Sequence, residues 1–152
     1  MILLYIVLGF VALVAAYIVV RNNRAPELGV ADGRLTPLPA TPNAVSTQTD
    51  DLARRIEPLP FAGDLSASKE RVLEAVNAYG HGVVVANEPN YLRIVFTTPG
   101  MRFKDDAEFS FDEQTRTIHY RSSSRVGASD MGLNRRRYEE LRARYVGDSD
   151  DA

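Results

Sequence analysis

The sequence predicts an α+β protein with an N-terminal transmembrane helix, a proline-rich tether and one domain. The domain should hold a mainly antiparallel sheet of about four strands and two helices, in the order α-β-β-β-β-α. Three observations predict this fold: an uncharged first segment, a stretch rich in proline and glycine, and a remainder that shows helical and then strand periodicity. The expected boundaries are 1–20 for the anchor, 21–41 for a flexible tether, 42–147 for the domain and 148–152 for an acidic, disordered tail.

The first 20 residues carry no charged side chain. A helix of that length spans about 30 Å, the hydrocarbon thickness of a bilayer. A cleaved signal peptide is the alternative, but it has a basic start, a shorter apolar run and a small-x-small cleavage site. Here no basic residue precedes the run, and Val14-Ala15-Ala16 is a weak cleavage site. The sequence therefore favours an uncleaved, single-pass anchor. Arg21 and Arg24 follow it and favour a cytoplasmic domain by the positive-inside tendency.

Prolines punctuate the stretch that follows the anchor, at Pro26, Pro37, Pro39 and Pro42. Proline removes an amide donor and fixes φ, so a continuous helix or a central strand is not expected there. We expect a partly extended spacer that holds the domain off the bilayer. Pro58 and Pro60 extend irregular structure, so residues 43–63 should wrap around the domain surface.

The first helix of the domain opens near Ser66, with Ser66 or Ser68 placed to cap it and Glu70 in its first turn. Gly80 should end it. Its apolar positions recur at helical spacing, at Leu65, Val72, Leu73, Val76 and Tyr79.

Four runs with strand character follow this helix. They are Gly82–Ala86, Tyr91–Thr97, a run with Ala107, Phe109 and Phe111 on one face, and a run with Ile118 and Tyr120 on one face. Alternation of this kind indicates a sheet that is buried on one side.

The apolar faces of the third and fourth runs match in one register. Phe111 then lies opposite Ile118, Phe109 lies opposite Tyr120, and a four-residue loop, Glu113–Arg116, connects the strands. A slip of one residue would turn the apolar set of one strand to solvent.

An acidic strand meets an arginine-rich segment in this register. Glu108 falls opposite Arg121, and Asp106 falls opposite Ser123, diagonal to Arg121 and Arg125. One interpretation is a cross-strand ion network, worth about 0.2–1 kcal/mol per pair. The other is that the arginines bind an anionic group, because a planar guanidinium matches carboxylate or phosphate.

Asp105 has the opposite parity and points toward the core, near the end of the sheet. A carboxylate there needs a partner or stays protonated. We expect that partner to be Ser124, which lies directly opposite, or an arginine of the last helix.

The last helix is expected from about residue 130 to residue 146. Its inward stripe consists of Tyr138, Leu141 and Tyr145. Asn134 lies at the centre of that stripe and Arg137 at its edge, so both are candidate buried polar contacts. Arg135 and Arg136 should face solvent.

The composition excludes several kinds of chemistry. The chain has no cysteine, which excludes disulfides, thiolate nucleophiles and cysteine-ligated zinc. A net charge of −2 argues against a nucleic-acid partner. His81 and His119 have no metal-ligand partner at i+2 or i+4, and no phosphate loop, nucleophile elbow or calcium loop is present. Asp105 and Asp106 face opposite ways on a strand and cannot share one proton. We expect no metal and no cofactor.

Four strings resemble the family catalogued as domain of unknown function 1499, which occurs in bacteria and plastids. They are Pro42–Gln48, Phe103–Asp106, Arg121–Gly127 and Ser129–Arg135, and their order and spacing agree over about residues 42–140. Family members often carry cysteine where Ala44 stands, which argues against a redox or metal role for this position here. The resemblance implies a compact α+β domain, usually exported or membrane-tethered, and no accepted reaction. Its export habit leads us to expect the outward side, the periplasmic side of the inner membrane if the source is bacterial.

The resemblance also implies that one motif set unites polar residues from distant parts of the chain. Its members are Asn43, Ser46, Gln48, Asp105, Asp106, Arg121, Ser122, Arg125, Asp130, Asn134, Arg135 and Arg137. Helix phase places Arg135 in solvent, so the two arguments disagree at that residue.

The leading hypothesis is a membrane-anchored, non-enzymatic module for ligand binding or assembly. The candidate ligand-binding residues are Arg121, Ser122, Ser124, Arg125, Asp105, Asp106, Asn134 and Arg137. Structural polar roles are expected for Asn43, Ser46, Gln48, Glu108, Asp130 and Arg135. The expected partners are the lipid bilayer, through residues 1–20, and an anionic small molecule or a membrane protein. The alternatives are a hydrolase that uses Asp105 or Asp106 as general base, and a polar cluster that is purely structural.

Overall fold

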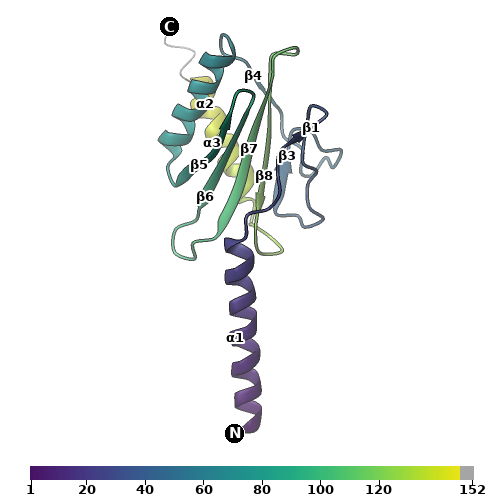
Figure 1. The fold of residues 1–152 in the computed structure, drawn as a ribbon, viewed down its shortest axis with the longest axis vertical. Coiled ribbons are helices and arrows are strands. Elements are labelled where there is room, and N and C mark those ends of the chain that lie inside the picture. The colour runs from purple at the N-terminus through teal and green to yellow at the C-terminus, as the bar shows by residue number, and fades with distance from the viewer. Residues whose placement is uncertain (148–152) are drawn as a thin grey trace.

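The computed structural model describes residues 1–147, which form three helices and eight strands. Helix α1 (Ile2–Asn23) projects from one end of the domain (Figure 1). The α+β class, the apolar N-terminal helix and the mainly antiparallel sheet are confirmed. The acidic tail expected at 148–152 lies outside the described residues.

Helix α1 packs none of its residues into a core. By length and composition it is long and apolar enough to cross a membrane, and signal sequences near an N-terminus share these properties. Its last turn carries Arg21, and the chain leaves the helix at Arg24, which has extended backbone angles.

The domain is built around one six-stranded antiparallel sheet. Its main path runs β3 (Ala44–Ser46), β8 (Thr117–Ser124), β7 (Lys104–Asp112), β6 (Tyr91–Thr97) and β5 (Gly82–Glu88), and β4 (Leu59–Pro60) also pairs with β8. Helices α2 (Leu65–Tyr79) and α3 (Leu133–Gly147) contact each other and cover one face, here called the inner face (Figure 1). Three long hairpin strands, β6 to β8, therefore form the centre of the domain.

The expectation of about four strands in the order α-β-β-β-β-α was wrong. Four further strands precede α2: β3, β4 and a small separate hairpin of β1 (Val30–Ala31) and β2 (Arg34–Leu35). Each is only two or three residues long, which is too short to show alternation, and prolines surround them. They lie within residues 21–63, where a tether and a surface wrap were expected.

The register predicted for the β7–β8 hairpin is confirmed. Phe111 pairs with Ile118, Phe109 with Tyr120, and Asp105 with Ser124. The predicted loop, 113–116, separates the two strands. Side-chain direction along both strands therefore follows the sequence parity, and this parity determines which polar residues meet.

The core lies between the inner face and the two helices. Phe96, Phe109, Ile118 and Tyr120 are at most 1% exposed and belong to one core cluster, in which the ring of Tyr120 packs against Tyr138 of α3. The predicted inward residues of α3 are all buried, namely Asn134, Arg137, Tyr138, Leu141 and Tyr145.

The ends of α2 were predicted with mixed success. Gly80 ends the helix as expected, with a φ of 82° that favours glycine. The serine cap was wrong, because Asp64 is the N-cap and its carboxylate accepts a hydrogen bond from the amide of Ala67. Ser68 is instead buried, and its hydroxyl accepts a 2.9 Å hydrogen bond from the amide of Ala62.

The outer face of the sheet is covered as well, which was not expected. Strand β2 packs over β7 and β8, where Leu35 is 4% exposed, and the Pro37 carbonyl accepts a hydrogen bond from Arg121. The charged residues on this face therefore lie in a largely enclosed layer. Solvent and salt therefore screen the ion pairs of this layer less than they would screen pairs on an open surface.

Candidate functional site

The polar motif residues divide between the two faces of the sheet. Asp105 and Asp106 are neighbours on β7, so their side chains point to opposite faces. Both carboxylates are 1% exposed. The structure thus contains two polar clusters, an inner one around Asp105 and an outer one around Asp106.

The inner polar cluster joins the sheet to α3. It consists of Asn43, Asp105, Ser122, Ser124, Asp130, Asn134 and Arg137. Arg137 donates to Asp105, which fulfils the expectation of an arginine partner from the last helix. Its guanidinium also lies over the ring of Phe96, 4.7 Å from the centroid.

Asn134 is the centre of this inner polar cluster and is fully buried. Its amide donates to the carbonyl of Asn43 at 3.1 Å, to the hydroxyl of Ser124 at 3.0 Å and to the carboxylate of Asp130 at 2.8 Å. Its carbonyl accepts from Ser122 and from Arg137. These bonds hold α3 against the sheet, and the Nε of Arg137 has no hydrogen-bond partner within residues 1–147.

The outer ion cluster is held by Asp106, which binds two arginines. Arg93 donates to Oδ1 of Asp106 through Nη2 at 2.7 Å and Nε at 3.1 Å. Arg125 donates to Oδ2 at 2.6 Å and to Oδ1 at 3.0 Å. The predicted pairing of Asp106 with Arg125 is present, and Arg93 was missed because the predicted register covers β7 and β8 but not β6.

Glu108 and Arg121 form the second part of the outer ion cluster. Glu108 is fully buried and accepts from Arg121 Nη1 at 3.1 Å and from the Tyr91 hydroxyl at 2.8 Å. Burial raises the pKa of the Glu108 carboxyl, and Arg121 opposes that rise. The Nε of Arg121 has no hydrogen-bond partner within residues 1–147.

The remaining motif residues hold loops in place. Ser46 accepts from the amide of Gln48, whose side chain binds the backbone of the β1–β2 hairpin at Gly33 and Leu35. Asp130 accepts from the amide of Asn134 at the start of α3.

Arg135 binds two loop carbonyls rather than solvent alone. It donates to the carbonyl of Ala53 at 2.8 Å and to that of Arg55 at 3.1 Å. Its geometry agrees with the motif set and not with helix phase. Arg136 stays exposed and donates to the nearby Met131 carbonyl.

The end of α1 is bonded directly to the sheet. The side chain of Asn22 accepts from the amide of Lys104 at 2.8 Å and donates to the carbonyl of Arg102 at 2.9 Å. Arg125 donates to the backbone carbonyl of Asn22 at 3.2 Å, while Arg21 donates to the carbonyl of Arg125 at 3.4 Å. The outer ion cluster is therefore contiguous with the exit of the N-terminal helix.

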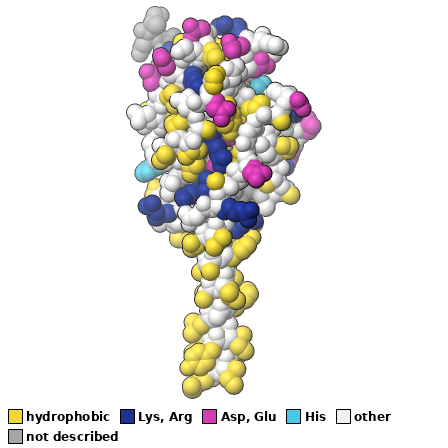
Figure 2. Space-filling view, in the orientation of Figure 1, with side chains coloured by type: hydrophobic (Ala, Val, Ile, Leu, Met, Phe, Trp, Pro, Cys, Tyr) yellow, Lys and Arg dark blue, Asp and Glu magenta, His cyan; other side chains and the backbone are white. Residues whose placement is uncertain are grey.

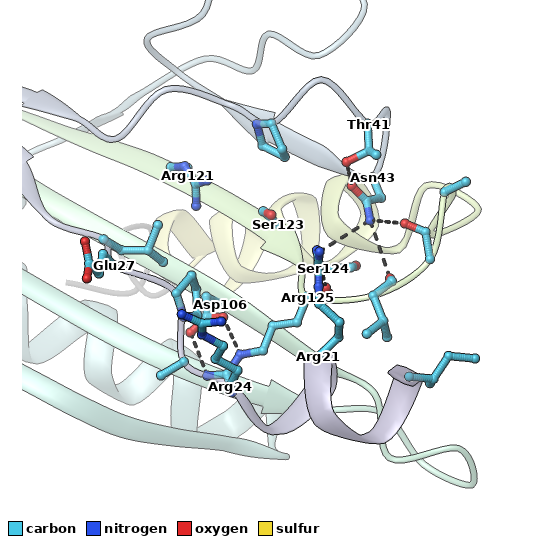
Figure 3. Close-up of a pocket in the computed structure, with 18 of the residues that line it drawn as sticks. Arg21, Arg24, Glu27, Thr41, Asn43, Asp106, Arg121, Ser123, Ser124 and Arg125 are labelled. Carbon is cyan, nitrogen blue, oxygen red and sulfur yellow. Dashed lines mark hydrogen bonds and ion pairs between the residues drawn. The ribbon is translucent and has the colours of Figure 1, made fainter. Parts of the chain in front are cut away.

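A cavity of about 960 Å³ lies at this meeting point and is called the junction cavity here. Tyr17, Ile18 and Arg21 of α1 line it together with Arg24, Glu27, Asp106, Arg121, Ser123, Ser124 and Arg125, among others. Figure 3 shows Arg21, Arg24, Arg121 and Arg125 converging on it from the helix end and from the sheet. Four arginines thus face two carboxylates, those of Asp106 and Glu27.

The four arginines differ in how they are held. Arg121 and Arg125 are buried or half-buried and paired with carboxylates. Arg21 and Arg24 are exposed, and the guanidinium of Arg24 makes no hydrogen bond or ion pair to any part of the chain that the structure describes. The cavity therefore combines two fixed cations with two that are accessible to a ligand.

The structure brings together only part of the predicted ligand-binding set. Arg121, Ser124, Arg125 and Asp106 line the junction cavity. The other predicted residues, Asp105, Ser122, Asn134 and Arg137, belong to the inner polar cluster on the opposite face. Sequence reasoning missed Arg21 and Arg24 as site residues, although their position directly after an apolar span was the available signal.

Asp105 and Asp106 are not placed to act as a general base. A general base must reach a substrate proton, whereas both Asp105 and Asp106 are 1% exposed and bound by arginines. No group of three or more metal-ligating side chains lies close enough to hold an ion in residues 1–147. The junction cavity is suited to binding an anion by charge and hydrogen bonds.

A family model described as protein of unknown function (DUF1499) matches residues 34–144. The chain belongs to this family. The DUF1499 match includes the strands β2 to β8 and both clusters, and it ends just before the last residues of α3. It confirms the resemblance carried by the four sequence strings and assigns no activity. Searches of the curated proteins and of the solved structures gave no match.

Proposed function

We propose that this protein is a membrane-anchored, non-enzymatic binding module that holds an anionic group in the junction cavity. The single observation that carries the proposal is the convergence of four arginines on that cavity against two carboxylates. Guanidinium groups bind phosphate and carboxylate in a bidentate manner, and partial enclosure strengthens such bonds.

The anchor is part of this site. Helix α1 supplies Tyr17, Ile18 and Arg21 to the lining, so a chain that lost α1 would lose one wall of the cavity. An uncleaved helix is therefore part of the proposal, in preference to a signal sequence. The expected periplasmic side rests on the habit of the family and stays a prediction.

The structural alternative applies to one cluster and not to the other. In the inner polar cluster, Asp105, Ser122, Asn134 and Arg137 are at most 2% exposed and are paired with one another, and the Nε of Arg137 has no hydrogen-bond partner in residues 1–147. The outer ion cluster differs in its access to a ligand, because Arg121 and Arg125 line the junction cavity together with Arg24, which is exposed to solvent. An anion in the cavity would therefore contact arginines of the outer ion cluster and of the α1 exit.

The test uses the full chain in a neutral detergent, with thermal unfolding measured in inorganic phosphate and in chloride of equal ionic strength. At a ligand concentration of about 100 times Kd, binding adds about 2.7 kcal/mol and raises the unfolding temperature by on the order of 10 °C. We expect phosphate to stabilise the natural chain and to stabilise Arg24→Gln much less.

The matched control is Arg142→Gln, an exposed arginine on α3 outside the cavity lining. It should respond to phosphate like the natural chain. An equal response of Arg24→Gln and Arg142→Gln, or no response beyond chloride in any of the three proteins, would sink the proposal.

A further inference from the structure

We propose that the α1 end of the domain is seated on the bilayer, and that the anionic group in the junction cavity is the phosphate of an acidic phospholipid of the adjacent leaflet. This inference rests on the proposed anion-binding function and adds the chemical class and the source of the ligand. Two exposed methionines on loops, both outside the cavity lining, indicate that the anion comes from a lipid rather than from solution.

The two loops lie at the end of the domain where α1 leaves it. Thr97 pairs with Lys104 at one hairpin end, so the β6–β7 loop, 98–103, begins and ends there. Asp105 pairs with Ser124 beside it, so the segment 125–132 starts at the same end. Figure 1 shows both loops reaching past the exit of α1, one on each side of the helix.

Each loop carries an exposed methionine, Met101 in the β6–β7 turn and Met131 in the turn just before α3. Met101 is 73% exposed and Met131 is 87% exposed. Met131 itself has a φ of 52°, and the glycines next to the two methionines, Gly100 and Gly132, have φ values of 74° and 76°. These tight turns direct a large apolar side chain away from the domain, and a flexible methionine suits the disordered interface of a bilayer.

Basic side chains lie beside both methionines, and Arg136 donates to the Met131 carbonyl at 2.7 Å. Arg102 is exposed beside Met101, and Lys104 donates to the side chain of Asn23 at 2.9 Å. Figure 2 shows lysine and arginine side chains gathered where the domain meets α1, with acidic side chains more frequent toward the opposite end. Exposed methionines beside basic side chains fit a bilayer, whose interior is apolar and whose headgroups are anionic.

The lining of the junction cavity also changes from apolar to basic along the end of α1. Tyr17 and Ile18, 61% and 37% exposed, belong to the last turns of the apolar helix, and Arg21 lies one turn further along. Tyrosine is common at the membrane interface, and the phosphate level lies just outside it. A phospholipid beside α1 would therefore place its glycerol region near Tyr17 and its phosphate near Arg21, Arg24 and Arg125.

The absence of cysteine makes the seating directly measurable. Met101→Cys, Met131→Cys and Val146→Cys would each be labelled with an environment-sensitive fluorophore, in the full chain reconstituted in nanodiscs that contain spin-labelled lipid. Val146 is a matched exposed apolar site near the far end of α3. We expect strong quenching at positions 101 and 131 and little at 146. Equal quenching at all three positions would overturn the seating.

Lipid preference is tested with the same chain in nanodiscs of equal phosphatidylcholine and phosphatidylglycerol with identical acyl chains. Native mass spectrometry should show phosphatidylglycerol retained in preference. Arg24→Gln should lose about fivefold of that preference, the factor that corresponds to about 1 kcal/mol per basic residue at an anionic surface. Arg142→Gln should keep it.

Retention without headgroup preference, or a preference that Arg24→Gln leaves unchanged, would overturn the lipid assignment. In that case a phosphate response in detergent would still support the proposed function with a soluble anion as ligand. If neither phosphate nor phosphatidylglycerol binds, both proposals fall.

Discussion

Asn134→Ala removes the centre of the inner polar cluster, and its cost follows from the contacts of this residue. The side chain takes part in five hydrogen bonds, two as acceptor and three as donor. Alanine leaves Arg137 and Ser122 without that acceptor in a closed interior. Asp130 keeps its bonds to the backbone amides of Gly132 and residue 134.

The expected loss of unfolding free energy is about 3–5 kcal/mol. A buried group that loses its partner costs about 1–3 kcal/mol, and more if it is charged. Two groups are left in this state, and the better helix propensity of alanine returns at most about 0.7 kcal/mol. Since domains of this kind have about 5–15 kcal/mol of stability in total, the substitution should remove a large share of it.

Urea unfolding of the full chain in neutral detergent measures this loss. The chain has seven tyrosines and no tryptophan, so tyrosine fluorescence and near-ultraviolet circular dichroism report on the core. With a slope of about 1–3 kcal/mol per M, the midpoint should fall by at least about 1 M. Asn77→Ala, the same change at an exposed position of α2, is the control and should be nearly neutral. A loss below about 1 kcal/mol at Asn134 would refute the assignment of this residue as the centre of the cluster.

Two further predictions concern the loops and the outer ion cluster. Arg135→Ala should cost about 1–2 kcal/mol and expose the 50–56 loop to proteolysis, because two carbonyl contacts are lost, while Arg136→Ala stays neutral under the same protease. Burial raises the pKa of Glu108 above its ordinary value of 4.5, so folding stabilises its protonated form. That contribution is complete below pH 4.5 and is lost as the pH rises through the raised pKa. The unfolding free energy of the natural chain should therefore fall relative to Glu108→Gln across this window, and a constant difference would contradict the reasoning.

The register of the β7–β8 hairpin could be predicted because only one register buries the apolar side chains of both strands. Phe109, Phe111, Ile118 and Tyr120 face the core together in one register only, and that register also places Glu108 against Arg121. Parity then determines the opposite directions of neighbouring carboxylates. Long alternating strands carry this information in the sequence itself.

The junction cavity could not be predicted in the same way. Its walls come from the end of α1 and the segment around Glu27, and from β7 and β8. About 80 residues or more of chain separate the first two parts from the two strands. No periodicity relates these parts, and the bonds between Asn22 and the start of β7 depend on how the helix leaves the domain. Short strands such as β1 and β2 are stabilised by tertiary contacts rather than by local pattern.

The two adjacent aspartates show how one motif can serve two purposes. Asp105 turns inward and binds Arg137, so its part of the motif fixes α3 to the sheet. Asp106 turns outward, and its two arginines place Arg125 against the end of α1 and beside the junction cavity. Loss of the inner contact should therefore act on folding, whereas loss of Arg24 should act on binding in a folded protein. Because Asn134 belongs to the motif set and Arg24 lies before the family match, the first measurement tests the folding role of the motif and the second tests binding in the junction cavity.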